Sequence, residues 1–202
     1  MLTTPVFLRT IFVAALASAF VLVSPLGNDP LQKSETKPAA TRPAENKPAS
    51  APATLKIGDA APAFRVADHT GKVRSLADFK GKRVILWFYP KANTSGCTKE
   101  GCGFRDRIAD IEKLGATVLG VSFDDATENS KFVTDQKFNF ALLCDTTKEM
   151  GLAYGAWSEG KPAYPARISY IIGKDGKIEN IYLKVNVTKH AGEIVEWLEK
   201  NK

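Results

Sequence analysis

The segment from Arg83 to Cys97, RVILWFYPKANTSGC, decides the fold of this chain. Its first seven residues, up to Tyr89, are almost continuously apolar, which is typical of a β-strand that is buried on both faces. A polar loop then begins at Pro90 and leads to Cys97, where a helical pattern starts. The segment therefore predicts a buried strand, a loop and a helix that begins close to a cysteine.

The residues after Cys97 predict how this strand connects to the next one. A helix is expected over 97–114, and Gly115 suits the position that follows a helix end. The apolar residues at helical spacing are Phe104, Ile108, Ile111 and Leu114. A second buried strand is expected over 117–123, so strand, helix and strand form a crossover between parallel strands.

The remaining pattern adds further helices and strands in alternation. The expected elements are helices over 126–137 and 147–154, a short strand over 141–144, and strands over 168–172 and 177–183. Lys174-Asp175-Gly176 lies between the last two strands and is a hairpin signal. Thr188 is predicted to cap a last helix, whose apolar face contains Ile194, Val195, Trp197 and Leu198. Together these elements predict an α/β fold in which a mixed central sheet is flanked by helices on both faces.

The first 27 residues are expected to be a targeting segment. Arg9 precedes an apolar run over 11–23 that is short for a membrane span. Ala17-Ser18-Ala19 offers a cleavage site of small residues, but it falls inside the run, so residues 1–27 are interpreted as a signal peptide or an N-terminal membrane anchor. As an anchor, residues 6–26 would tether the protein to a membrane; a plain core strand is the remaining alternative. Both leading interpretations predict an exported protein, either periplasmic or membrane-anchored and facing outside the cytoplasm.

Residues 28–53 have the composition of a disordered linker. They are rich in Pro, Ala and Lys, and they cannot bury enough apolar surface to offset the entropy of ordering the chain. The folded domain is therefore expected to cover residues 54–202.

Composition and charge narrow the classes of function. Of the 202 residues, 44 % are apolar, which fits one folded domain with extensions. The net charge is +6, but Lys and Arg are scattered among Asp and Glu, so nucleic acid is not an expected partner. Three cysteines are too few for a disulfide scaffold. Cys97 and Cys102 lie close together in the sequence, which indicates a reactive pair of thiols. Cys144 lies far from both and is interpreted as a small buried hydrophobe.

Cys97 is the candidate nucleophile. At the start of a helix the unpaired backbone N–H groups and the helix dipole favour a negative charge, so the thiolate gains stability. The alternative is an inert buried cysteine. The position of Cys97, at a strand-to-helix junction beyond the end of a buried strand, favours the nucleophile.

Cys102 lies on the same predicted helix, five residues after Cys97. In an intact helix the two Cα atoms would be roughly 8 to 9 Å apart, beyond the usual reach of a disulfide. The helix must therefore unwind locally before the two sulfurs can bond. Gly101 and Gly103 each lower helix propensity by about 1 kcal/mol, which would help such opening; the alternative is that they allow close helix contacts.

The segment from Tyr89 to Asp106, YPKANTSGCTKEGCGFRD, resembles the active-site segment of the peroxiredoxins, specifically of the bacterioferritin-comigratory-protein or PrxQ group. Pro90, Thr94 and Cys97 match the motif of that family, and Cys102 matches its resolving cysteine. Similarity continues from Gly58 to the C-terminal part of the chain. The resemblance implies a thioredoxin-like fold for residues 54–202.

The resemblance also assigns roles to the matched residues. Cys97 would attack a peroxide and become a sulfenic acid, and Arg167 would stabilise the thiolate and the leaving oxygen. Thr94 would orient the peroxide and Pro90 would shield the sulfur. Cys102 would close an intramolecular disulfide with Cys97. The implied substrates are hydrogen peroxide and organic hydroperoxides, the implied partner is a thioredoxin-like reductant, no cofactor or metal is implied, and a monomer suffices.

Two other classes of function compete with the peroxidase. A copper-binding assembly protein of thioredoxin fold would use a C-x-x-x-C pair with a distant histidine, and a thiol-disulfide reductase would use C-x-x-C. The spacing here is C-x-x-x-x-C. His69 and His190 match no ligand spacing, and Glu100 is expected to stabilise the helix start through its charge.

Overall fold

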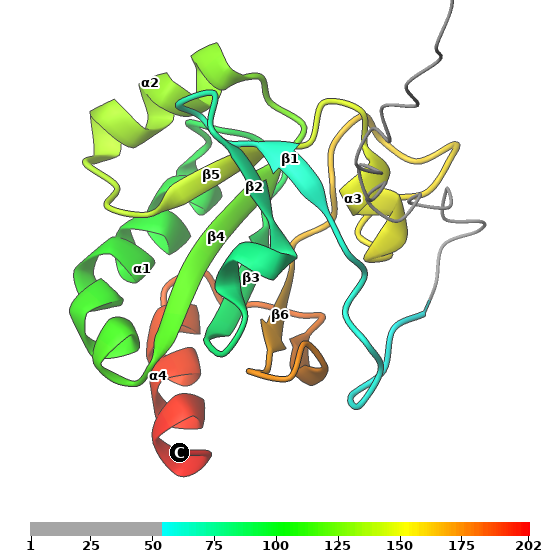
Figure 1. Cartoon of the computed structure of the whole chain (residues 1–202). Helices are drawn as coiled ribbons and strands as arrows, with labels where there is room; N and C mark the ends of the chain where they lie inside the picture. Colours follow the sequence, from blue (N-terminus) through cyan, green and yellow to red (C-terminus); the bar gives the residue numbers. More distant parts are fainter. Residues whose placement is uncertain (1–53) are drawn as a thin grey trace, which may run out of the picture. The chain divides into compact units, whose positions relative to one another are not determined.

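The computed structural model describes residues 54–202, so the segments predicted as a signal or anchor (1–27) and as a linker (28–53) lie outside the described residues. A five-stranded sheet forms the centre of the domain, in the order β5-β4-β3-β6-β7 (Figure 1). Its strands are β3 (Arg83–Phe88), β4 (Ala116–Ser122), β5 (Ala141–Cys144), β6 (Ile168–Ile172) and β7 (Ile178–Tyr182). A separate two-stranded sheet joins β1 (Arg65–Ala67) to β2 (Val73–Ser75), and a short 3-10 helix, η1 (Leu76–Phe79), follows.

The sheet is mixed, as the sequence predicts. β3 pairs in parallel with β4, and β4 pairs in parallel with β5, so the crossover between the two buried strands is confirmed. β6 pairs antiparallel with both β3 and β7, which confirms the hairpin at one side of the sheet. Because β6 runs antiparallel to β3, with Phe88 opposite Ile168, the start of β6 lies beside the end of β3.

Helices cover both faces of the sheet and divide the core in two. The helices are α1 (Ser95–Lys113), α2 (Ala126–Gln136), α3 (Glu149–Ala153) and α4 (His190–Lys200). One core cluster joins the sheet to α1, α2 and α4 through residues such as Phe104, Phe132 and Ile194. The other contains Met150 of α3 on the opposite face. In Figure 1, α1 and α4 lie side by side, and the two helices are in contact.

The ends of two helices test the predicted caps. Gly115 follows α1 with φ +76°, a left-handed conformation that suits glycine, as predicted for the residue after the helix end. The prediction for Thr188 is wrong, because α4 begins at His190 with Lys189 as its N-cap residue. The Thr188 hydroxyl instead donates a 2.7 Å hydrogen bond to Asn186 Oδ1. Asn186 also accepts from the Thr188 backbone, so a local turn occupies the hydroxyl that was expected to cap the helix.

Within residues 54–202, each helix is too short or too polar to cross a lipid bilayer.

Candidate active site

Cys97 lies in the first turn of α1, just beyond the loop that follows β3. The first backbone hydrogen bond of the helix runs from Thr98 N to Thr94 O, at 2.8 Å. Cys97 therefore belongs to the turn whose N–H groups have no partner within the helix. Its side chain is fully buried in the cluster that lies between the sheet and α1. The strand, the loop and the helix predicted from the sequence thus deliver a buried sulfur to a helix N-terminus.

Arg167 brings a positive charge to this sulfur from the start of β6, the strand that pairs with β3. It immediately precedes β6, whose start lies beside the end of β3. Its Nη2 donates a hydrogen bond to Cys97 Sγ at 3.3 Å. Gly96 allows this approach, because a Cβ at that position would lie 3.3 Å from Nη2. The antiparallel pairing of β6 therefore unites two residues that are 70 positions apart.

Glu100 holds the opposite side of the same guanidinium. Its carboxylate accepts a hydrogen bond from Arg167 Nη1, and its side chain is fully buried. Burial raises the pKa of the Glu100 carboxyl from 4.5 to about 7, while the positive charge of Arg167 acts in the opposite direction. Glu100 therefore does more than stabilise the helix start, since it pairs with the arginine that contacts the sulfur.

His190, to which the sequence assigned no partner, lies next to this pair. It is the first residue of α4 and is fully buried. Its Nε2 lies 2.9 Å from Ser169 Oγ and 3.9 Å from Glu100 Oε1. Burial, together with the positive charge of Arg167, lowers the pKa of His190 from 6.5 to about 4. At neutral pH the imidazole is therefore uncharged, and it lies next to the Glu100 carboxyl.

Thr94 and Pro90 flank Cys97 on the loop side. Thr94 occupies the N-cap position of α1 with extended backbone angles. Its side chain is exposed, and its hydroxyl donates a 2.9 Å hydrogen bond to Lys91 O. Pro90 follows β3 and is half-buried. Both residues border the loop that carries the cysteine, and the Thr94 hydroxyl is accessible from solvent.

Cys102 lies on α1 but faces a different element. Its half-buried Sγ donates to Gln136 Oε1, at the end of α2, over 3.8 Å. Cys97 and Cys102 are both free thiols, and α1 runs unbroken through both of them. Gly101, between the cysteines, packs closely, because a Cβ there would lie 2.4 Å from Cζ of Phe138. The alternative interpretation of Gly101, a close contact of the helix, is thereby confirmed.

Sequence comparison places this arrangement in a family. The sequence model described as the AhpC/TSA family matches residues 57–181. Peroxiredoxin Bcp of Escherichia coli is 39 % identical over 153 residues, which cover 73 % of this chain and 97 % of that protein. This chain is a peroxiredoxin of the AhpC/TSA family. A chloroplastic protein of rice named putative peroxiredoxin Q is 37 % identical over 143 residues, covering 70 % of this chain and 66 % of that protein.

Solved structures of peroxiredoxins share the fold. Peroxidoxin BcpB from Mycobacterium tuberculosis aligns with a TM-score of 0.69 and 30 % identity, over 73 % of this chain and 99 % of that one. A PrxQ from Xylella fastidiosa aligns with a TM-score of 0.70 and 28 % identity, over 74 % and 98 % of the two chains. The predicted thioredoxin-like fold and the predicted group are confirmed. The chain is thus a thiol peroxidase, and the copper-binding and reductase alternatives are not favoured.

An apolar groove lies along the segment that precedes Arg167 in the chain. The groove has a volume of about 340 Å³ and is lined by residues of the segment 155–166 that leads into Arg167. Its lining includes Trp157, Pro162 and Tyr164, and the Tyr164 side chain is exposed.

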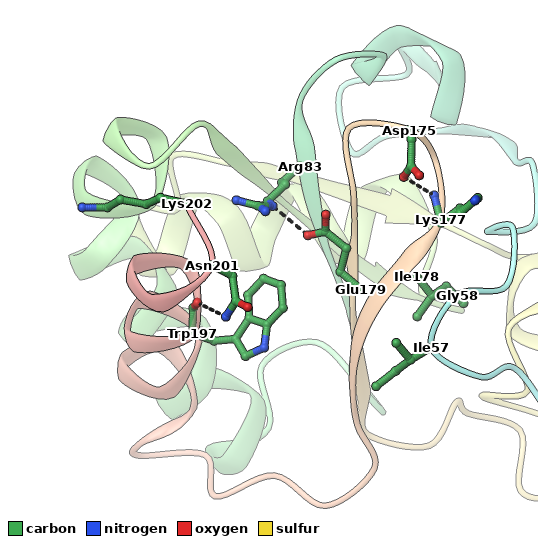
Figure 2. Close-up of a pocket in the computed structure, with 10 residues that line it drawn as sticks. All are labelled: Ile57, Gly58, Arg83, Asp175, Lys177, Ile178, Glu179, Trp197, Asn201 and Lys202. Carbon is green, nitrogen blue, oxygen red and sulfur yellow. Dashed lines mark hydrogen bonds and ion pairs between the residues drawn. The ribbon is translucent and has the colours of Figure 1, made fainter.

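A larger groove lies at the opposite end of β3. Figure 2 shows its lining, which includes Arg83, Glu179 and Trp197. Arg83 pairs with Glu179 at 2.7 Å and lies over the Trp197 ring, so its charge is already engaged. Because Arg83 begins β3 and Cys97 follows its end, the length of the strand, about 20 Å, separates this groove of about 520 Å³ from the sulfur.

Cys144, the third cysteine, ends β5. Asn129 Nδ2 donates a hydrogen bond to its Sγ at 3.4 Å. Burial raises the pKa of the Cys144 thiol, which disfavours the reactive thiolate. Cys144 is half-buried and belongs to neither core cluster, so the expectation of a small buried hydrophobe is wrong as to its burial. Among residues 54–202, no cluster of three or more His, Cys, Asp or Glu side chains is arranged to hold a metal ion.

Proposed function

We propose that this peroxiredoxin reduces hydrogen peroxide and organic hydroperoxides with Cys97 as the attacking thiolate. The observation that carries the proposal is the 3.3 Å hydrogen bond from Arg167 Nη2 to Cys97 Sγ at the N-terminus of α1. A guanidinium and a helix N-terminus both favour negative charge on the sulfur. The same guanidinium can receive the charge that develops on the leaving oxygen.

In the first step the Cys97 thiolate attacks one peroxide oxygen in line with the O–O bond. An S–O bond forms, the O–O bond breaks, and the leaving oxygen takes up a proton to become water or an alcohol. Cys97 is oxidised to a sulfenic acid while the peroxide is reduced. The exposed Thr94 hydroxyl would exchange its bond to Lys91 O for a bond to the peroxide, and Pro90 would limit the access of water to the sulfur.

In the second step Cys102 attacks the sulfenic acid sulfur of Cys97. An S–S bond forms, the S–O bond breaks, and hydroxide leaves and is protonated to water. A thioredoxin-like dithiol then reduces the disulfide by thiol exchange. Because both cysteines belong to one chain, we propose that a monomer completes the cycle.

The apolar groove lined by residues of the segment 155–166, which leads into Arg167 along the chain, supports the organic hydroperoxides as substrates. Trp157 and Tyr164 present ring surface next to the segment that carries the arginine. Replacing Tyr164 by Ser should therefore raise KM for cumene hydroperoxide by about threefold to tenfold, as expected for losing part of an apolar contact. Its KM for hydrogen peroxide should not change, and an equal change for both substrates would contradict the groove's role.

The proposal is tested by single turnovers followed by intact mass. The parent chain, reduced and mixed with one equivalent of hydrogen peroxide, should lose two hydrogens as the disulfide forms. Cys97→Ser should show neither oxidation nor turnover with thioredoxin, and Cys102→Ser should stop at the sulfenic acid. Cys144→Ser is the matched control and should behave as the parent does. Turnover by Cys97→Ser would refute the mechanism.

We further propose that the chain is exported, on the basis of Arg9 and the apolar run over 11–23. Expression of the full chain in a bacterium, followed by fractionation and N-terminal mass analysis, tests this. The chain should be found outside the cytoplasm, either shortened or in the membrane fraction. A full-length chain confined to the cytoplasm would contradict export.

A further inference from the structure

Phe138, two residues after the end of α2, packs against α1 between the two cysteines. The ring of Phe138 points at Gly101, since a Cβ there would lie 2.4 Å from Cζ and 3.0 and 3.1 Å from the two Cε atoms. Phe138 is itself buried and supported by other aromatic rings. It stacks on Phe140 with centroids 5.1 Å apart and meets Phe132 edge-on at 4.7 Å. These aromatic contacts therefore fix the position and the orientation of the Phe138 ring.

Two polar contacts attach the same part of α1 to the same turn. Arg105 Nη1 donates a 2.7 Å hydrogen bond to the backbone oxygen of Gln136, the last residue of α2. Cys102 Sγ contacts the side chain of Gln136 at 3.8 Å. Gln136 and Phe138 thus touch α1 at three positions, 101, 102 and 105. We call these two residues the α2 clamp.

The stretch of α1 that the clamp holds is the stretch that must open. Cys97 Sγ faces Arg167, whereas Cys102 Sγ faces Gln136. Five residues apart on an intact helix, the two sulfurs cannot bond, because the helix places their Cα atoms roughly 8 to 9 Å apart. Bond formation therefore requires residues 97–102 to leave the helix, which breaks the contacts of Gly101 and Cys102 with the clamp.

We infer that the α2 clamp sets the rate at which Cys102 reaches the oxidised Cys97. The inference rests on the proposed function, because it needs Cys102 to be the resolving thiol. Phe138 and Gln136 carry no charge and act on the reaction through their contacts with α1, so they are positioning residues. They stabilise the closed helix, so the Cys97 sulfenic acid stays beside Arg167 until the helix opens.

The lifetime of the Cys97 sulfenic acid in the closed helix decides which of two reactions it undergoes. If the helix opens first, Cys102 forms the S–S bond and water leaves. If a second peroxide arrives first, the Cys97 sulfenate attacks it, a second S–O bond forms, and the O–O bond breaks to release water or an alcohol. The sulfur is then a sulfinic acid and is lost to the cycle. The clamp therefore sets the peroxide concentration at which the enzyme inactivates itself.

The test compares clamp variants of the full chain in rapid-quench experiments read by intact mass. Phe138→Leu shortens the ring contact with Gly101, and Gln136→Ala removes the contact with Cys102. Phe64→Leu is the matched control, since Phe64 is buried in the other core cluster. Its side chain lies on the face of the sheet away from α1, so it reports the effect of general destabilisation.

Disulfide formation in Phe138→Leu should be about tenfold faster than in the parent, as expected for a contact whose loss costs about 1.4 kcal/mol. Gln136→Ala should show a smaller increase in the same direction. The sulfinic fraction at millimolar peroxide should fall by a similar factor, and the rate of the first oxidation should not change. Phe64→Leu should match the parent in all three measurements.

An unchanged or slower disulfide step in Phe138→Leu would overturn the inference, as would equal acceleration in Phe64→Leu. Failure of the proposed function has a different signature. In that case the parent itself would form no disulfide between Cys97 and Cys102 under a single equivalent of peroxide, whatever residue occupies position 138.

Discussion

Cys97 and Cys102 share one helix, but their side chains meet different surroundings. Cys97 is fully buried and receives a hydrogen bond from a guanidinium at 3.3 Å. Cys102 is half-buried and faces a neutral amide at 3.8 Å. The element that each sulfur faces makes the difference, since one meets the start of β6 and the other meets the end of α2. The helix α1 sets the separation of the two cysteines, and the elements packed against it set the surroundings of each sulfur.

The largest expected effect concerns the charge at Cys97. Arg167→Gln should slow the first oxidation of Cys97 by about 100- to 1,000-fold, the usual loss when a donor to a developing negative charge is removed. Stopped-flow measurement of the second-order rate constant with hydrogen peroxide checks this. Arg105→Gln, which removes the guanidinium on the Cys102 side, is the control and should leave the first oxidation within about twofold of the parent, as expected for a charge that does not contact the reacting sulfur. Equal losses in both variants would erase the contrast between the two sulfurs.

A second expected effect concerns the pH dependence of stability near Cys97. Because burial raises the pKa of Glu100 from 4.5 to about 7, the folded state keeps a proton that the unfolded chain releases between these values. The free energy of unfolding should therefore fall as pH rises through this window, by up to about 1.4 kcal/mol per pH unit. In Glu100→Gln this contribution is absent, so the stability of the variant relative to the parent should rise from pH 4.5 to 7.

Urea denaturation of parent and variant at several pH values measures the difference between them. His190 contributes with the opposite sign, because its folded pKa of about 4 lies below its usual 6.5, and stability from this group rises with pH between these values. Gln136→Ala, on the Cys102 side, removes no titrating group and should run parallel to the parent. A parallel curve for Glu100→Gln would show that the buried carboxyl does not titrate in this window.

A third effect separates the two glycines that flank Cys102. Gly101→Ala should destabilise the fold by about 1 to 3 kcal/mol, because its Cβ would meet the ring of Phe138 and force overpacking. Gly103→Ala should stabilise the fold by up to about 1 kcal/mol through helix propensity, since its Cβ would lie at an ordinary 3.4 Å from Ala191. Thermal unfolding of both variants checks the opposite signs, and the same sign for both would remove the special role of Phe138.

The smallest expected effect is on the first oxidation when Cys102 is replaced. Cys102→Ala should change the rate constant of Cys97 with peroxide by less than about twofold, because its sulfur faces Gln136 and not the Cys97 side chain. A competition assay against a second peroxidase provides the measurement. A loss of tenfold or more would mean that the two sulfurs are coupled before any oxidation occurs.

Much of this site could be predicted because its parts are local in sequence. The buried run of β3, the loop and the start of α1 follow from apolar patterning and from the cysteine that ends the loop. The spacing of Cys97 and Glu100, three residues apart on one helix, also carried a signal, since such residues share a face. The spacing therefore predicts that Glu100 points toward the site and not toward solvent. The helix-dipole argument alone does not predict this direction.

The remaining parts depend on packing between distant elements. Arg167 was assigned only through the family resemblance, because its meeting with Cys97 requires the antiparallel pairing of β6 with β3. His190 was given no partner, since its burial beside Glu100 arises from the contact of α4 with α1. The cap predicted at Thr188 failed because a turn at Asn186 competes for the same hydroxyl. Each of these outcomes depends on contacts that form only in the folded protein.

The pairing of β6 with β3 has a consequence for the newly made chain. Since the guanidinium and the thiol are 70 residues apart and meet only across a formed sheet, a chain that has not yet folded carries an ordinary cysteine at position 97. Peroxide sensitivity is thus acquired together with the native state. Under the proposed mechanism, the polypeptide is spared during its synthesis the oxidation that Cys97 undergoes in the folded protein.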